Sequence, residues 1–243
     1  MPAGTKYGAS SWTATAVQPD SSALISPEPR TLRRGGALWR CDILGIVAVT
    51  VTANDNAMDS KANPALRIRE SRASDVGAIL RIYAEEVRTG TASFELVAPS
   101  REEMSVRRES LLAAGFPYLV AELGDLFAGY AYAGPYRTRP AYRFTVENSV
   151  YVAKRARKRG VGLQLLNTLI SECEAGGFRQ MVAIIGDSRH TASIQLHSRA
   201  GFRLVGTIQN VGMKFGGWLD SVLMQRALGE GANTIPTEPL HDG

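Results

Sequence analysis

Residues 149–164 have the sequence SVYVAKRARKRGVGLQ, the most informative stretch of the chain. Ser149–Val152 is rich in β-branched and aromatic residues, as strands are, and apolar residues recur at helical spacing from Leu163 onward. Five basic residues occupy the six positions 154–159 between these two segments. The stretch therefore predicts a strand that leads through a basic loop into a helix.

The glycines that follow the basic residues predict a site for a phosphate group. The first backbone N–H groups of a helix have no intrahelical acceptor and lie at the positive end of the helix dipole. Gly160 and Gly162 would let a bulky anion approach these groups closely. Neither the Walker pattern nor GxGxxG is present, so Arg157-x-x-Gly160-x-Gly162 predicts a pyrophosphate site of another kind. A solvated basic loop is the alternative, but it leaves the glycines unexplained.

Strand and helix patterns alternate on both sides of this stretch, which predicts an α/β domain with a mixed sheet. The first half of the domain contains a hairpin and the second half a β-α-β order. We expect helices that begin at Ser74 and at Ser100, helices at residues 160–175 and 192–200, and strands at residues 66–70, 118–122, 126–133, 144–152, 178–185, 203–208 and 221–225.

The chain of 243 residues predicts one domain, at residues 66–228, between two less regular segments. Residues 1–60 are expected to be a disordered or dispensable extension, and residues 229–243 a disordered tail. The apolar run at 43–53 lies too far from the N-terminus for a signal peptide. No apolar stretch approaches the roughly 20 residues of a membrane helix, and two cysteines cannot form a disulfide scaffold.

The net charge of +5 is unevenly distributed. It is the sum of zero in residues 1–60, +8 in residues 61–228 and −3 in residues 229–243. A nucleic-acid-binding module is one explanation for the basic domain, but such a module needs basic or aromatic residues spread along one face. Here the charge is concentrated in one loop, which favours the phosphates of a cofactor and argues against nucleic-acid or membrane partners.

The loop after Val150–Val152, with Arg157, Gly160 and Gly162, resembles the acetyl-CoA signature of the GNAT N-acetyltransferases. Residues 192–202 (ASIQLHSRAGF) resemble the second signature of this family. The resemblance covers nearly all of residues 66–228. It implies the GNAT fold, a mixed central sheet flanked by helices, in which a parallel pair of strands splays apart at the acetyl-CoA site.

Four further segments resemble the phosphinothricin and methionine sulfone (sulfoximine) acetyltransferase branch: residues 91–95 (TASFE), 131–135 (AYAGP), 142–152 (YRFTVENSVYV) and 212–220 (GMKFGGWLD). This resemblance implies a cytoplasmic enzyme, a homodimer, that uses acetyl-CoA and no metal. It would acetylate the α-amino group of a small amino acid or analogue by direct attack in a ternary complex. The alternative is another amine, such as a polyamine, an aminoglycoside or a protein N-terminus. Within the last segment, Lys214, Trp218 and Asp220 match the branch, and packing or a dimer contact is the alternative.

The resemblance implies that the cofactor is held by backbone groups of the strand, by the loop and helix start, and by the next helix. The Val152 N–H would lie near the thioester oxygen. His190 stands where the family usually has Asn, so its contact is a departure from the pattern. The predicted cofactor residues are Val150, Tyr151, Val152, Arg157, Lys158, Arg159, Gly160, Val161, Gly162, Leu163, His190 and Ser193.

Acetyl transfer to an amine needs a group that takes the amine proton and one that protonates the leaving thiolate. The family places a glutamate at Glu147 for the first task, and a strand carboxylate in a salt bridge is the alternative. His197, where many members have Tyr or His, could perform the second task or be a packed residue. The predicted acceptor-binding residues are Phe94, Glu95, Arg137, Thr138, Arg139 and Tyr142. Two histidines without a third ligand at suitable spacing predict no metal site.

Overall fold

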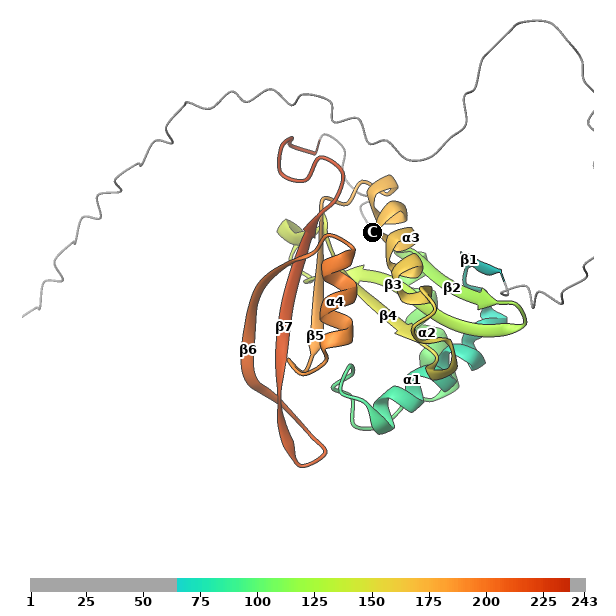
Figure 1. Cartoon of the computed structure of the whole chain (residues 1–243). Coiled ribbons are helices and arrows are strands. Elements are labelled where there is room, and N and C mark those ends of the chain that lie inside the picture. The colour runs from blue at the N-terminus through green and yellow to red at the C-terminus, as the bar shows by residue number, and fades with distance from the viewer. Residues whose placement is uncertain (1–64, 237–243) are drawn as a thin grey trace, which may run out of the picture. The chain divides into compact units, whose positions relative to one another are not determined.

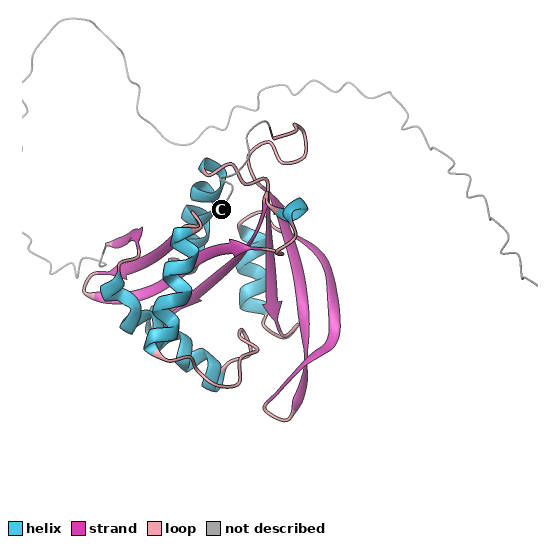
Figure 2. Ribbon diagram, turned by 180° about the vertical axis from the view of Figure 1, so that it is seen from behind, coloured by secondary structure: helices cyan, strands magenta, loops and turns pink. Residues whose placement is uncertain are grey.

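The computed structural model describes residues 65–236, which contain one seven-stranded sheet flanked by helices (Figures 1 and 2). The predicted extension at residues 1–60 and the last residues of the predicted tail, 237–243, lie outside the described residues. The strands are β1 (Leu66–Glu70), β2 (Tyr118–Leu123), β3 (Leu126–Pro135), β4 (Thr145–Val152), β5 (Gln180–Gly186), β6 (Arg203–Lys214) and β7 (Gly217–Ala227). The helices are α1 (Val76–Thr89), α2 (Arg101–Ala113), α3 (Val161–Ala175) and α4 (Thr191–Arg199).

The two faces of the sheet carry separate cores, and β2 shows why. Its side chains alternate, so that Leu119 and Ala121 pack in the cluster that includes the buried face of α3, while Tyr118 and Val120 pack in the cluster of α1 and α2. Helix α4 joins the α3 side through Ala200 at its C-terminal end. The sheet is thus covered on both faces, which confirms the predicted α/β class.

The local helix signals were correct at α2 and wrong at α1. Ser100 precedes α2, and its hydroxyl oxygen accepts the Glu103 N–H at 3.1 Å, as predicted. Ser74 does not cap α1, because it lies inside a short 3-10 turn, Ala73–Asp75. The carboxylate of Asp75 organises this turn instead: it accepts the Arg72 N–H at 2.7 Å and forms a salt bridge with Arg69 from β1.

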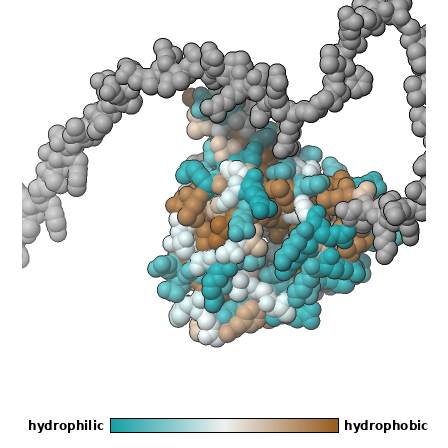
Figure 3. All heavy atoms as spheres, in the orientation of Figure 1, coloured by the Kyte–Doolittle hydropathy of each residue, from teal (hydrophilic) through white to brown (hydrophobic). Residues whose placement is uncertain are grey.

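The last two strands are longer than the sequence predicted. Their pairing continues past Ile208 to the pair Lys214 and Gly217. The register shifts twice, between Leu204 and Gly206 and between Ile208 and Gly212, and the second shift includes Asn210 at a φ of +53°. Such bulges let a ladder continue past residues that do not fit regular pairing. The resulting hairpin extends beyond the other strands at the lower end of the domain in Figure 1. Hydrophobic and hydrophilic residues are interspersed on the face of the domain in Figure 3.

Strands β4 and β5 are parallel and separate part-way along their length. They pair only from Thr145 with Gln180 to Asn148 with Ala183. Beyond Asn148, β4 continues to Val152 beside β3, and β5 continues to Gly186 beside β7. The two strands therefore diverge, which confirms the splayed parallel pair and leaves an opening in the sheet.

Candidate active site

The edge of β4 that borders the opening carries backbone groups without a partner in β5. The backbone groups of Thr145 and Ala153 point toward β3: the Ala153 N–H donates to Ala128 O, and the Thr145 carbonyl accepts the Tyr136 N–H. The other odd-numbered residues of β4 lie between these two and direct their backbone groups to the same side. Because successive residues of a strand direct their N–H and C=O to opposite sides, Val150 and Val152 direct theirs into the opening. The carbonyl of Val152 accepts the Arg157 Nε–H at 3.3 Å. The Val152 N–H remains directed at the opening.

Two pockets meet at this edge. The first, the strand pocket, has a volume of about 470 Å³ and lies between β4, β5 and the segment after α1. The second, the loop pocket, has a volume of about 540 Å³ and lies between β4, the basic loop, the start of α3 and α4. They share the lining residues Ala92, Val150, Tyr151, His190 and Ser193. The two pockets therefore adjoin along β4.

The loop pocket has the geometry of an anion cradle. Lys158 and Gly160 have left-handed backbones, with φ of +61° and +79°, and turn the chain into α3. The N–H groups of residues 161–163 have no acceptor within the helix and lie at the positive end of its dipole. A Cβ on Gly162 would lie 3.4 Å from Val152 Cγ2, so the helix start packs directly against the strand. Arg157 to Leu163 line this pocket with the exception of Arg159.

Leu163 contributes both to the core and to the loop pocket. It is half-buried, packs against the core cluster that includes α3 and lines the loop pocket. Leu165, Leu166 and Leu169 are the fully buried leucines of α3.

Glu86 is a residue of the loop pocket that the sequence did not indicate. Its side chain is 14% exposed, and it forms a 3.3 Å salt bridge with Arg157. Its other carboxylate oxygen accepts the Ala92 N–H at 3.4 Å. Glu86 therefore holds the Arg157 guanidinium beside the cradle and links it to the segment after α1.

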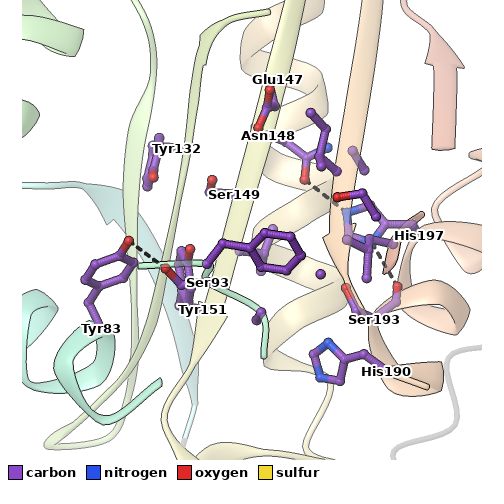
Figure 4. A pocket seen from close by; sticks show the side chains of 18 of the residues that line it. Tyr83, Ser93, Tyr132, Glu147, Asn148, Ser149, Tyr151, His190, Ser193 and His197 are labelled. Atoms are coloured by element: carbon purple, nitrogen blue, oxygen red, sulfur yellow. Dashed lines mark hydrogen bonds between the residues drawn. The ribbon is translucent and has the colours of Figure 1, made fainter. Parts of the chain in front are cut away.

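His190 and Ser193 stand where the two pockets meet. His190 precedes α4, and Figure 4 shows its ring at one end of the strand pocket. Its Nδ1 is buried and has no hydrogen-bond partner among the described residues. A buried polar atom without a partner costs about 1–3 kcal/mol. A polar group of a bound ligand that reached this atom would offset this cost.

Glu147 lines the strand pocket from β4, on the side of the opening opposite α4 (Figure 4). Burial raises the pKa of its carboxyl group, and the positive charge of Arg137 counteracts part of this shift. A desolvated carboxylate with a raised pKa is a better base than an exposed one. The geometry therefore suits Glu147 to proton transfer.

His197 is buried in α4, and both of its ring nitrogens contact oxygen atoms. Nδ1 lies 2.8 Å from the Ser193 carbonyl oxygen, and Nε2 lies 3.0 Å from Asn148 Oδ1 (Figure 4). Burial lowers the pKa of His197 and favours the neutral ring, which has one N–H. A ring that takes up a proton can donate to both oxygens. The two acceptors therefore offset part of the cost of charging this buried ring.

Several polar residues of the strand pocket escaped the sequence analysis as individual site residues. Tyr83 and Ser93 form a buried 3.0 Å hydrogen bond between their hydroxyl groups (Figure 4). Asn148 holds the ring of His197 and donates to Val182 O at 3.2 Å. Tyr132, Ser149 and Ser221 add to the polar lining. For the strand residues the signal was present, because polar side chains in buried strands require partners.

The structure separates the six predicted acceptor residues into two groups. Phe94 and Glu95 line the strand pocket, and Glu95 forms a 2.6 Å salt bridge with Arg107. The other four do not line it: Arg137, Thr138, Arg139 and Tyr142. Arg137 is close enough to lower the pKa of Glu147, and its guanidinium lies 4.4 Å from the centre of the Tyr136 ring. No lysine or arginine lines the strand pocket in the described part of the chain.

Within residues 65–236 no group of three or more His, Cys, Asp or Glu side chains could hold a metal ion. In the same residues, no helix has both the length and the apolar character that a membrane crossing requires.

Comparison with known proteins gives consistent matches over the described domain. Residues 68–223 match the family described as the acetyltransferase (GNAT) domain. A phosphinothricin N-acetyltransferase of Alcaligenes faecalis is 53% identical over 175 residues, which are 72% of this chain and 89% of the relative. An L-methionine sulfoximine/L-methionine sulfone acetyltransferase of Pseudomonas paraeruginosa is 39% identical over 160 residues, 65% of this chain and 92% of the relative.

A solved structure agrees in fold. A GNAT superfamily phosphinothricin acetyltransferase from Sinorhizobium meliloti, in complex with AcCoA, is 44% identical and superposes with a TM-score of 0.70. The match covers 73% of this chain and 96% of that one.

Proposed function

The chain belongs to the GNAT family of acetyltransferases, and from this premise we propose that it acetylates the α-amino group of a small amino acid or analogue. Phosphinothricin, methionine sulfone and methionine sulfoximine are the acceptor types that its relatives' names support. The observation that carries the proposal is the open edge of β4, which borders an anion cradle on one side and a desolvated carboxylate on the other. Acetyl-CoA supplies the activated acetyl group as a thioester.

The residues of the loop pocket fit the cofactor that the family implies. Three free N–H groups at the start of α3 and the guanidinium of Arg157 suit a pyrophosphate. The backbone groups of Val150 and Val152 suit an extended pantetheine arm, which would add to the sheet where β5 has diverged from β4. The unpartnered His190 Nδ1 suits a polar group of the same arm.

For the chemical step, we assign proton removal to Glu147 and proton delivery to His197. Glu147 takes a proton from the ammonium group of the acceptor, directly or through water, so that the amine can attack. The Val152 N–H stabilises the negative charge that develops on the thioester oxygen. We assign the proton for the leaving thiolate to the charged form of His197. The ring, protonated from solvent beforehand, would release this proton from Nε2, give up its contact with Asn148 Oδ1 and return to the neutral form that burial favours.

Arg137 is the residue that we assign to the carboxylate of the acceptor. The strand pocket has no lysine or arginine in its lining, whereas the electrostatic effect of Arg137 reaches Glu147 at its edge. A guanidinium binds a carboxylate or phosphinate through two parallel hydrogen bonds. Thr138, Arg139 and Tyr142 lie in the same loop and would approach the pocket with it.

A thiol-release assay tests the proposal. The full chain is supplied with acetyl-CoA and one acceptor at a time: phosphinothricin, methionine sulfone, methionine sulfoximine, an aminoglycoside, a polyamine or a short peptide. We expect turnover with the amino-acid analogues and little with the others, because only the former carry a carboxylate on the same carbon as the amine, where the loop that contains Arg137 could bind it. Turnover confined to the polyamine, the aminoglycoside or the peptide would contradict the acceptor class.

The basic loop also bears on the alternative of a nucleic-acid-binding module. Lys154 forms a 2.9 Å salt bridge with Glu85, and Arg157 forms one with Glu86. Part of its charge is thus neutralised by α1, which favours the phosphates of one cofactor over a polyanion. We also place the enzyme in the cytoplasm, where the buried free thiol of Cys173 would stay reduced.

We propose that the enzyme is a homodimer that associates through β6. This edge strand carries five exposed apolar side chains: Leu204, Val205, Ile208, Val211 and Met213. An unpaired, apolar edge is rare on a monomer and typical of an interface. We expect light scattering to give twice the mass of one chain. A monomer at micromolar concentration would contradict this proposal.

A further inference from the structure

The segment Gly90–Glu95, which we call the acceptor wall, leaves α1 and lines the strand pocket through Ala92 to Glu95. In Figures 1 and 2 it turns from the end of α1 toward the β6–β7 hairpin. It contains no regular helix or strand. Its position therefore depends on contacts with neighbouring elements.

Lys214, at the end of β6, provides two of these contacts. Its side chain is buried, with the residue only 5% exposed, and Nζ donates to Gly90 O at 2.9 Å and to Ser93 O at 2.7 Å. These two carbonyl groups flank the first half of the acceptor wall. A buried ammonium group is costly unless it is fully hydrogen-bonded. Packing alone would be served by an apolar residue, so the charge indicates a role in holding the backbone.

Gly212 provides the third contact. It lies two residues before Lys214, so both use the same face of β6. A Cβ on Gly212 would lie 2.4 Å from Phe94 Cε2 and 2.7 Å from Phe94 Cδ2. Gly186 of β5 approaches the same ring, since a Cβ there would lie 2.9 Å from Phe94 Cε1. The Phe94 ring thus fits between β5 and β6 only because Gly186 and Gly212 have no side chain.

Other contacts hold the wall from the side of α1. The Ala92 N–H donates to Glu86, and the Ser93 hydroxyl group is hydrogen-bonded to Tyr83. The wall is thus held by α1 on one side and by β6 on the other. Of the two α1 residues, Glu86 lines the loop pocket and Tyr83 lines the strand pocket, so only the β6 contacts can be altered without changing a residue that lines a pocket.

We propose that Gly212 and Lys214 are positioning residues that set the place of the acceptor wall and thereby the acceptor selectivity of the strand pocket. The effect on turnover rests on the proposed function, whereas the effect on the wall itself does not. Neither residue lines either pocket, so both act through Phe94 and the backbone of the wall.

Gly212→Ala tests the ring contact, and Gly206→Ala is its matched control. Gly206 lies on the same strand, and a Cβ there would have no neighbour within 4 Å. We expect Gly212→Ala to raise the KM for the amino-acid acceptor about 10- to 100-fold while the KM for acetyl-CoA stays within about twofold, because Phe94 must leave its place. Gly206→Ala should leave both unchanged. Equal kinetics for the two variants would overturn the proposal.

Lys214→Met tests the backbone contact, and Arg203→Met, at the other end of β6, is its control. We expect Lys214→Met to raise the KM for the acceptor about tenfold. Hydrogen exchange of the amides of residues 91–95 should accelerate by a similar factor, while that of β4 should not. Unchanged exchange at residues 91–95 would overturn the proposal even if no acceptor is found. Faster exchange without turnover on any amino acid would refute only the proposed function.

Discussion

Glu147→Gln is expected to lower kcat about 10²- to 10⁴-fold, the usual contribution of a general base. The glutamine keeps the shape of the side chain and loses the ability to take a proton. Glu147 lines the strand pocket and has a carboxyl group whose pKa is raised by burial. Steady-state kinetics with acetyl-CoA and a methionine sulfone acceptor would measure the effect. The affinity for acetyl-CoA should change little, because Glu147 does not line the loop pocket.

The pH profile gives this prediction a second readout. A base must be deprotonated, so kcat/KM should fall as pH drops through the pKa of Glu147. Because burial raises that pKa, the fall should begin at a higher pH than the ordinary value of about 4.3 for glutamate would give. Glu147→Gln should lack this acid limb. A limb that persists in the variant would belong to another group.

Stability separates loss of the base from loss of the fold. The folded-state pKa of Glu147 lies above its unfolded value, so its ionised form opposes folding once pH exceeds the folded pKa. Glu147→Gln should therefore melt at an equal or higher temperature than the parent at neutral pH. Glu109→Gln, an exposed carboxylate of α2, serves as control and should leave turnover unchanged. Near-normal turnover of Glu147→Gln would remove Glu147 from the mechanism.

The parts of the site that could be predicted are those encoded by neighbouring residues. The cradle is one continuous stretch of sequence. Gly160 turns the chain into α3 and Gly162 packs against β4, and the neighbouring residues alone indicate that glycine is needed there. The splay of β4 and β5 followed from the family resemblance to the same stretch. The α/β order likewise followed from periodicity, which depends on residues one turn or one strand apart.

The contacts that the sequence did not reveal join residues far apart in the chain. Lys214 lies 121 positions from Ser93, Arg157 lies 71 from Glu86, and His197 lies 49 from Asn148. The residues of each pair are polar residues of common types, and they lie too far apart in the chain for helix or strand periodicity to relate them. For this reason the sequence alone does not separate packing from a dimer contact at Lys214. Only the folded backbone brings these groups within hydrogen-bond distance.

Val152→Pro is expected to lower kcat about 10²- to 10³-fold. The substitution removes one backbone N–H, the group that we assign to the thioester oxygen, and loss of one such donor typically costs about 2.7–4 kcal/mol of barrier. Proline is tolerated where the N–H of a strand is not used in the sheet. Val152 meets this condition, because its N–H points into the opening beyond the last pair of β4 with β5. Tyr151 before it is already extended, as a residue before proline prefers.

Val152→Ala is the matched control, since it shortens the same side chain and keeps the N–H. If the N–H acts on the developing oxyanion, Val152→Ala should retain most of the turnover while Val152→Pro loses it. Desulfo-CoA, which lacks the thioester, should bind to Val152→Ala with an affinity close to that of the parent. Val152→Pro also loses a backbone group that we assign to the pantetheine arm and should bind it less tightly, so kcat is compared at saturating acetyl-CoA. Melting curves would show whether the proline variant is folded. Equal kcat in the two variants would exclude the Val152 N–H as an oxyanion donor. The stabilisation would then have to come from another donor, and the Val150 N–H and the ring of His190, both at the junction of the two pockets, would be the first to test.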